Sequence, residues 1–268
     1  MSKEITDKEL KDIQLKMIEE INNFCRRYNL SFYLAYGTLI GAVRHKGYIP
    51  WDDDIDILMP RKDYERFIKE FQSNSGLGVL SYQNDKDYYL PFSKVINEKT
   101  CLKEGINYNV NIGVYIDVFP LDNIPNGKVA RKIQFYKAKF FRNIINLKPL
   151  DKNKKKNPFK RLIINVAKVF TFFLKMEFLN KMINKIAIKY NTKDTNYVGN
   201  LTALAYKNRE FWNKDDFKET VYMNFEGIKL PCPKGYDNIL RKTYGDYMKL
   251  PPKEKQVSHH VFEAWWKE

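Results

Sequence analysis

Hydrophobic and polar positions near the start of the chain follow the period of a helix. Between residues 10 and 25 the apolar side chains recur every three or four positions, which predicts an amphipathic helix that ends near Tyr28. Thr6 and Glu9 have the spacing of a capping box, in which each side chain binds a free backbone N–H group at a helix start. The sequence therefore predicts both this helix and the residues that begin it.

Shorter patterned runs follow the first helix. The aromatic-rich run at 31–36 predicts a buried strand, and 38–45 has a short helical pattern. Acids alternate with aliphatic residues at 54–59, as in a half-buried strand that Pro60 ends, and 61–71 is expected to be helical. Further strands are predicted at 78–83, 91–97 and 113–119.

The second half of the chain has a different pattern. From 128 to 190 it is helical and rich in lysine, with a break at 151–158, and beyond that a strand is predicted at 221–230 and a helix at 237–244. These elements predict an α+β fold, with a mixed β-sheet core, flanking helices and a basic helical insertion. The predicted parts are a core at 1–125, the insertion at 126–190 and a C-terminal portion at 191–268.

The positive charge of the chain is concentrated in the predicted insertion. The 268 residues carry a formal charge of +15 from 47 Lys and Arg residues and 32 acids. Of these, 18 basic residues and two acids lie within 126–190, so the remainder has a net charge of −1. A nucleic-acid-binding protein is one hypothesis for so basic a chain. Because the excess lies in one segment and no base-stacking aromatic motif accompanies it, nucleic acid is not an expected partner.

The cysteines and the N-terminus bear on the compartment. Cys25, Cys101 and Cys232 are far apart and form no Cys-x-x-Cys pair, which favours a reducing compartment over a disulfide framework or a zinc finger. The first ten residues hold no apolar core of a secretory signal. We therefore expect a cytoplasmic protein.

Asp54 and Asp56 are the first candidates for chemistry. Residues two positions apart in a strand project from the same face, so both carboxylates are expected to point to one place while Ile55 enters the core. Such carboxylates repel each other unless a cation lies between them, and Asp52 and Asp53 add negative charge. Mg²⁺, or Mn²⁺ in its place, prefers oxygen ligands of this kind. The alternative is a solvated acidic turn at a strand start.

Two more features accompany the paired acids. Gly37 and Thr38 follow a predicted strand and open a short helix, where backbone N–H groups can bind phosphate, although a Gly-Thr pair by itself is more often a simple turn. Asp117 is embedded in the apolar run 115–119, and a buried carboxylate is costly unless it is paired or bound to metal. A neighbouring Lys or Arg would satisfy Asp117 equally well, so both readings stay open.

A longer motif connects these features. The segment 34–67, LAYGTLIGAVRHKGYIPWDDDIDILMPRKDYERF, holds both the Gly-Thr pair and the acid-x-acid pair. Together with the later single acid, this order resembles the nucleotidyltransferase superfamily related to DNA polymerase beta. More specifically, the segment is similar to the signature of the LicD family, which includes bacterial phosphocholine transferases and is related to fukutin-related protein, a ribitol-phosphate transferase. The resemblance continues at 94–96 with Thr100, at 116–122, and at 236–240, 244–248 and 250–252.

The resemblance implies that 1–125 is a nucleotidyltransferase-like catalytic core and that the C-terminal portion at 191–268 completes its site. It also implies a metal-dependent reaction. An alcohol phosphate, with phosphocholine as the expected group, would pass from a CDP-linked donor to a sugar hydroxyl of a glycan such as teichoic acid or lipopolysaccharide, releasing CMP. Asp54 and Asp56 would hold the metal, and Asp117 would accept the acceptor's proton or bind a second metal. Transfer of a nucleoside monophosphate to a small molecule is the alternative. The candidates for phosphate and diphosphate contacts are Gly37, Thr38, Arg44, His45 and Lys94.

A phosphocholine substrate would require aromatic rings around its quaternary ammonium group. Several aromatic residues lie near the motifs in the sequence, and such residues are more often core than cage. The sequence does not choose among them. They are Tyr36, Tyr48, Trp51, Tyr88, Tyr89 and Tyr115.

One apolar run in the insertion suggests a membrane surface as a partner. Residues 162–174 form a run of 13 positions interrupted by Lys168, too short to span a bilayer, which needs about 20 apolar residues. Its basic flanks fit an interfacial helix on anionic lipid at the inner face of the membrane, near a lipid-linked acceptor. A helix packed in the core with a solvated basic face is the alternative.

Overall fold

The computed structural model describes residues 3–104, 112–147, 171, 173–257 and 262–268. Within these residues the protein has an α+β architecture, in which a curled mixed sheet of seven strands is accompanied by helices and by two separate two-stranded sheets. The predicted α+β class is therefore confirmed.

The first helix, α1 (Asp7–Tyr28), begins where the sequence predicted. The Thr6 hydroxyl accepts a hydrogen bond from the Glu9 backbone N–H at 3.3 Å, and the Glu9 carboxylate accepts one from the Thr6 N–H at 3.1 Å, which completes the capping box. The helix ends at Asn29, whose left-handed backbone has a φ of 52°. Its apolar stripe, which includes the fully buried Ile18, packs against the core.

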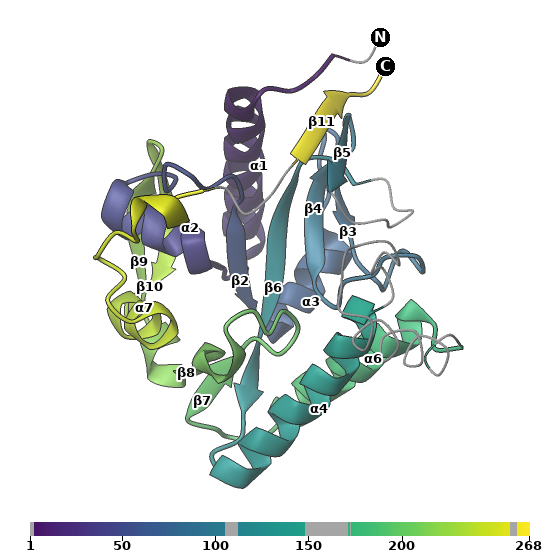
Figure 1. The fold of residues 1–268 in the computed structure, drawn as a ribbon, viewed down its shortest axis with the longest axis vertical. Coiled ribbons are helices and arrows are strands. Elements are labelled where there is room, and N and C mark those ends of the chain that lie inside the picture. Colours follow the sequence, from purple (N-terminus) through teal and green to yellow (C-terminus); the bar gives the residue numbers. More distant parts are fainter. Residues whose placement is uncertain (1–2, 105–111, 148–170, 172, 258–261) are drawn as a thin grey trace.

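The central sheet places its longest strand between parallel and antiparallel neighbours. From one edge to the other, its five main strands are β1 (Tyr33–Leu34), β2 (Asp56–Pro60), β6 (Tyr115–Ile124), β4 (Ser93–Asn97) and β3 (Leu77–Leu80). β2 runs parallel to β6, and the other neighbouring pairs are antiparallel. In Figure 1, α1 lies behind the central strands, and it contacts β6.

The second half of β6 continues the sheet into the C-terminal portion. β7 (Tyr197–Gly199) pairs antiparallel with the end of β6, and β8 (Phe211–Asn213) pairs with β7. At the opposite end of the molecule, β5 (Thr100–Glu104) and β11 (Phe262–Trp266) form a separate ladder. The N-terminal segment pairs with β11 through a bridge between Glu4 and Trp265, so the two ends of the chain lie together at the top of Figure 1.

The helices predicted next to the central sheet are present, but some of their ends differ from the prediction. The helix predicted at 38–45 begins earlier, as α2 (Tyr36–Ile40), and continues as a π-helical turn, η1 (Gly41–His45). α3 (Arg61–Glu70) follows β2 directly, as predicted. α7 (Tyr236–Tyr244) confirms the helix predicted near the C-terminus. Short 3₁₀ turns occupy Ile188–Tyr190, Lys207–Glu210, Lys214–Phe217 and Lys253–Lys255.

Two helices make up most of the insertion that the structure describes. α4 (Lys128–Leu147) and α6 (Met176–Ala187) lie side by side along the lower edge of the molecule in Figure 1 and contact each other. The Asn180 side chain of α6 donates a hydrogen bond to the Tyr88 carbonyl at 3.1 Å, which ties this pair to the core. The predicted break at 151–158 and most of the apolar run at 162–174 lie outside the described residues. Among those described, no helix has the length and apolar character needed to cross a membrane.

Three predicted strands need correction. The single strand predicted at 221–230 is wrong, because the chain forms a hairpin there, of β9 (Thr220–Phe225) and β10 (Ile228–Pro233). Glu226 and Gly227 make its turn with φ values of 50° and 87°, as in a type I′ turn. The strand predicted at 31–36 is two residues long, and the one predicted at 54–59 begins only at Asp56.

Candidate active site

Three charged side chains form a row across the middle of the sheet. Asp56 on β2 lies opposite Asp117 on β6, and Asp117 lies opposite Lys94 on β4. Residues directly opposite each other on neighbouring strands project from the same face. The register therefore brings together three candidates that are up to 61 positions apart in the sequence.

Lys94 is almost completely buried and is directed at Asp117. Its side chain is 3% exposed, and its ammonium nitrogen lies 2.6 Å from Asp117 Oδ1. The same nitrogen lies 3.2 Å from the centre of the Tyr115 ring. A buried ammonium group needs such partners because it has lost its hydration. The basic neighbour that the sequence left open for Asp117 is thus present, and a diphosphate contact for Lys94 stays a prediction.

An acidic loop precedes β2 and adds three more carboxyl groups. Asp52, Asp53 and Asp54 each offer a carboxylate oxygen, and these oxygens lie within 4.8 Å of one another. The loop follows a turn in which the Asp52 N–H donates to the Ile49 carbonyl at 2.8 Å, with Pro50 inside the turn. Oxygen ligands at this separation fit a hard divalent cation.

The position of Asp54 differs from the one that the sequence predicted. Because β2 begins at Asp56, Asp54 belongs to the preceding loop, and the alternation of a strand does not determine where its side chain points. The two residues are nevertheless electrostatic neighbours. Burial raises the pKa of Asp56 well above its usual value, and the charges of Asp54, Asp117 and Asp52 add to the rise, whereas Lys94 opposes it. A cation bound among these carboxylates would relieve their repulsion.

Helix α1 holds the acidic loop through Gln14, which the sequence analysis did not single out. The buried Gln14 amide donates to the Asp53 carbonyl at 3.0 Å and to the Tyr115 carbonyl at 3.4 Å. Its oxygen accepts a hydrogen bond from the Tyr48 hydroxyl at 2.9 Å. One side chain therefore fixes the loop relative to β6. A polar residue on the apolar face of a predicted helix was the available signal.

The Gly-Thr pair also supports the acidic loop. The Thr38 hydroxyl accepts a hydrogen bond from the Asp56 backbone N–H at 2.8 Å. A Cβ atom at Gly37 would lie 2.5 Å from Asp52 Oδ2, closer than two such atoms can approach. Glycine is therefore required at this position for the Asp52 carboxylate to lie against α2. Binding of phosphate by the backbone N–H groups of the pair stays a prediction.

Arg44 and His45 lie on the π-helical turn and contact other parts of the chain. The Arg44 side chain donates to His45 Nε2 at 2.9 Å and also to the Tyr247 carbonyl. Burial lowers the pKa of His45, and the Arg44 charge lowers it further, which agrees with a neutral ring that accepts a hydrogen bond. The His45 ring packs edge-on against Trp51, beside the acidic loop, with 6.5 Å between ring centres. Their predicted contact with a diphosphate stays a prediction.

An aromatic cluster from distant parts of the chain adjoins Asp56. The Tyr36 ring stacks on Tyr206 with 5.8 Å between centres, and Tyr206 meets Tyr244 at 4.7 Å. Burial raises the pKa of all three tyrosines, and the negative charge of Asp56 contributes to each rise. Tyr36 lies close to the motifs in the sequence, whereas no local pattern in the sequence predicts that Tyr206 belongs to the site.

A buried acid lies within the same cluster. Glu210 is fully buried, and its carboxylate accepts hydrogen bonds from the Tyr36 hydroxyl at 2.9 Å and from the Tyr206 backbone N–H. Asn200 donates to the Tyr36 hydroxyl from the other side, at 2.9 Å. Burial raises the pKa of Glu210 to about 7, against the two hydrogen bonds, which lower it. Aromatic faces and a carboxyl group are the surroundings that suit an organic cation.

The other aromatic residues considered for a cage have their own contacts. Tyr48 packs against Phe225 with 4.9 Å between ring centres, and Tyr88 lies beside Tyr89 at 5.8 Å. Tyr115 lies under the Lys94 ammonium group and is 4% exposed. Of the residues considered, Tyr36 is the one that the aromatic contacts place in the cluster beside Asp56.

Comparison with known proteins identifies the family. The family model described as LicD/FKTN/FKRP, nucleotidyltransferase domain, matches residues 29–155, which include α2, the acidic loop and the charged row. The lipopolysaccharide cholinephosphotransferase LicD of Haemophilus influenzae is 32% identical over 98% of this chain and 99% of its own length. An uncharacterized protein of Rickettsia prowazekii, RP689, is 28% identical over 41% of this chain and 39% of its own length.

The match over nearly the full length of two chains goes beyond a shared motif. The chain belongs to the LicD family and is a LicD-type transferase. This family is in general metal-dependent, and the acidic loop at Asp52–Asp54 offers the oxygen ligands that such a metal requires.

Proposed function

We propose that the protein transfers phosphocholine from CDP-choline to a sugar hydroxyl of a cell-surface glycan, with lipopolysaccharide as the first candidate acceptor. The full-length similarity to a lipopolysaccharide cholinephosphotransferase supports the transferred group and the acceptor. The observation that carries the proposal is the charged row of Asp56, Asp117 and Lys94 beside the acidic loop. Carboxylates gathered in this way suit a metal-bound diphosphate donor.

The residues of the row and the acidic loop would have different roles in the reaction. Mg²⁺, or Mn²⁺ in its place, would supply the positive charge that stabilises the leaving phosphate. Asp54 and Asp56 would hold this ion, with Thr38 fixing the backbone of Asp56. Asp117, oriented by Lys94, would take the proton of the acceptor hydroxyl. The oxygen of that hydroxyl would at the same time bond to the phosphorus of phosphocholine. The bond from that phosphorus to the CMP phosphate breaks, and CMP leaves with the electron pair.

The aromatic cluster would bind the choline end of the donor. Tyr36, Tyr206 and Tyr244 are adjacent to Asp56, so a donor diphosphate held at the row would place its alcohol within reach of their rings. A quaternary ammonium group gains about 0.5–2 kcal/mol from a good aromatic face. Glu210 behind the rings adds a carboxyl group to the same surroundings.

The family description favours one second candidate. Because the matching family is described as a nucleotidyltransferase domain, transfer of a nucleoside monophosphate from CTP to a small molecule is the reaction to test beside the first. The released product separates the two. Pyrophosphate release from CTP would support nucleotidyl transfer, and CMP release from a CDP-alcohol would support the proposed reaction.

The test offers the purified protein CDP-choline, CDP-ethanolamine, CDP-glycerol and CDP-ribitol with Mg²⁺ and no glycan. It measures the slow background release of CMP, in which water takes the place of the acceptor hydroxyl and receives the alcohol phosphate. We expect CDP-choline to give the highest rate. With this donor, the rate of the Asp56→Asn variant should be lower than that of the wild type by roughly a hundredfold or more. Because the raised pKa of Asp56 shows that its charge is disfavoured without a cation, Asp56→Asn should unfold at the same or a higher temperature in metal-free buffer.

Asp194→Asn is the matched control for this test. Asp194 is fully exposed and lies 3.7 Å from Lys214, so its loss removes an acid of the same kind far from the row. This variant should keep the wild-type rate. A wild-type rate for Asp56→Asn, or CTP turnover without any CMP release from the CDP-alcohols, would contradict the proposal.

We also infer that the enzyme acts in the cytoplasm at the inner face of the membrane, on an acceptor that is still linked to lipid. The strong positive charge of 126–190 supports this location, because the cytoplasmic leaflet carries anionic lipids.

A further inference from the structure

Helix α4 has apolar residues on two opposite faces. One face is buried against the rest of the molecule and includes Ala138 and Ile145. A second apolar stripe is exposed, with exposed fractions of 71% at Val129, 50% at Ile133, 61% at Tyr136 and 61% at Phe140. At 3.6 residues per turn, the four positions of the second stripe fall within about 60° of the helix circumference, opposite the buried face.

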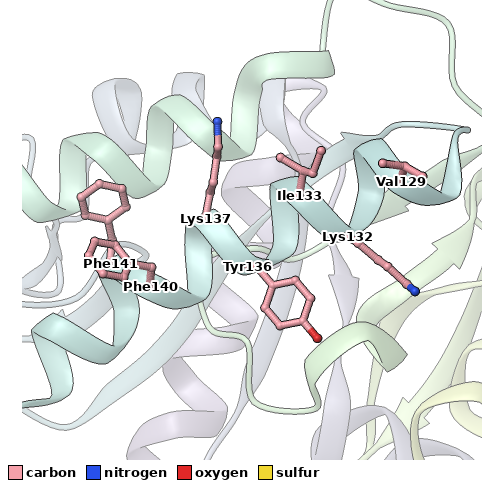
Figure 2. A pocket seen from close by; sticks show the side chains of 7 residues that line it. All are labelled: Val129, Lys132, Ile133, Tyr136, Lys137, Phe140 and Phe141. Atoms are coloured by element: carbon pink, nitrogen blue, oxygen red, sulfur yellow. The ribbon is translucent and has the colours of Figure 1, made fainter.

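The exposed stripe borders a hollow on the molecular surface. This hollow has a volume of about 460 Å³, and the described residues that line it all belong to α4, with Phe141 at one end of it and Val129 at the other. Figure 2 shows the apolar side chains spaced along the helix, with the amino groups of Lys132 and Lys137 at its two margins. Monomeric proteins rarely expose a continuous run of large apolar side chains unless it binds something.

The charge of α4 indicates what would cover the stripe. Its 20 residues contain six Lys and Arg residues and no acid. Lys132 and Lys137 are exposed and lie on either side of the apolar stripe on the helix. An apolar stripe with a purely basic border fits the surface of an anionic bilayer, where the apolar side chains enter the interface and the amino groups meet lipid phosphates.

We propose that the exposed face of α4 (Val129, Ile133, Tyr136 and Phe140, with Lys132 and Lys137) docks the protein on an anionic membrane. Its purpose rests on the proposed function, because a membrane surface would bring the enzyme to a lipid-linked acceptor. The binding itself needs no turnover. This surface is distinct from the run at 162–174, which lies outside the described residues.

The test measures flotation of the full chain with lipid vesicles at low salt. Vesicles of phosphatidylethanolamine with about one-third phosphatidylglycerol should bind the protein, and vesicles of phosphatidylcholine alone should bind it at least tenfold less. The double variant Ile133→Ser/Phe140→Ser should reduce binding to anionic vesicles by roughly tenfold or more, and Lys132→Gln/Lys137→Gln should do the same. The first variant changes no charge, so the two results separate apolar from electrostatic contributions.

Tyr222→Ser/Val257→Ser is the matched control, since these side chains are 59% and 53% exposed and lie outside α4. It should bind vesicles as the wild type does. Equal binding by all variants, or wild-type binding that does not distinguish anionic from neutral lipid, would overturn the proposal. So would a lipid-free dimer in light scattering that Ile133→Ser/Phe140→Ser converts to a monomer, because a second copy would then cover the face.

Failure of the docking surface and failure of the proposed function can be told apart in the same preparations. CMP release from soluble CDP-choline should be the same for the wild type and for every α4 variant. Vesicle binding without CMP release would support the docking surface and contradict the proposed donor. CMP release without vesicle binding would support the proposed donor and contradict the docking surface.

Discussion

Glu210 is an acid held inside the aromatic cluster, and its surroundings make the stability of the protein depend on pH. Burial raises its pKa from 4.5 to about 7. Between these two values the folded protein holds a proton on Glu210 that the unfolded chain has already released. The free energy of unfolding therefore falls as the pH rises through this range, by about 3 kcal/mol in total. The full stability is present only below the pKa that Glu210 has in the unfolded chain.

The variant Glu210→Gln should lack this dependence, because an amide does not titrate. We expect the difference in unfolding free energy between the variant and the wild type to shift by about 3 kcal/mol in favour of the variant between pH 4.5 and 7.5. Urea unfolding at several pH values measures this difference, and other titrating groups cancel in it. Two curves that stay parallel across the range would show that Glu210 does not titrate there.

Residues of the charged row were predictable from the sequence one by one, but their grouping was not. Asp56 and Asp117 interrupt apolar strands, and such interruptions are visible in any single sequence. The ion pair between Asp117 and Lys94 depends on the register of two antiparallel strands, which pattern alone leaves open. The contribution of Tyr206 and Glu210 to the site was not predictable, because both residues lie about 170 positions after Tyr36 and only the tertiary fold brings them to it.

Among the elements, helix α1 positions the acidic loop through the hydrogen bonds of Gln14. Replacing it by a side chain of similar length without polar atoms, Gln14→Met, would leave the Asp53 and Tyr115 carbonyls and the Tyr48 hydroxyl without this partner. Each unsatisfied buried group costs about 1–3 kcal/mol. We therefore expect a less stable protein whose acidic loop is less well held.

The functional consequence of Gln14→Met should appear in the metal requirement. Residues that orient metal ligands typically change affinity by about 10–100-fold, so half-maximal CMP release should need at least about tenfold more Mg²⁺. Glu19→Gln, at an exposed position of the same helix, should leave the Mg²⁺ requirement unchanged. An unchanged requirement in Gln14→Met would show that the loop keeps its geometry without α1.

Elements with strong local signals were predicted well, and those set by distant contacts were not. The capping box fixed the start of α1 because both of its partners are local. The sequence of the hairpin at 220–233 has the pattern of a single strand, because Glu226 is unusual in a type I′ turn, where Asn or Asp is preferred. Its carboxylate accepts a hydrogen bond from the Tyr48 N–H at 3.0 Å, a contact 178 positions away that no local pattern reveals.

At the scale of the whole molecule, a buried ion pair connects the three predicted parts of the chain. Arg61 at the start of α3 donates to both carboxylate oxygens of Asp122 on β6, at 2.7 Å and 2.6 Å. Arg61 also donates to Asn184 of the insertion at 3.0 Å, and Asn191 donates to Asp122 at 2.6 Å. The boundaries predicted at 125 and 190 stay predictions, but this network crosses both of them.

The position of this network predicts which ion pair matters for stability. Asp122 is completely buried and Arg61 is 10% exposed, so Asp122→Asn would leave a guanidinium charge in a low-dielectric interior. Breaking a buried pair in this way costs about 3–5 kcal/mol, and we expect the unfolding free energy to fall by that amount. Unfolding in guanidinium chloride, monitored by circular dichroism, measures this loss.

The exposed pair of Arg66 and Glu70 gives the matched control, because its side chains are 39% and 41% exposed and remain hydrated when the pair is broken. Glu70→Gln should cost less than about 1 kcal/mol. If both variants lost the same stability, burial would not be the deciding factor. If Asp122→Asn unfolded in two steps, with the helices of the insertion melting first, the network would prove to hold the insertion to the core more than it stabilises either part.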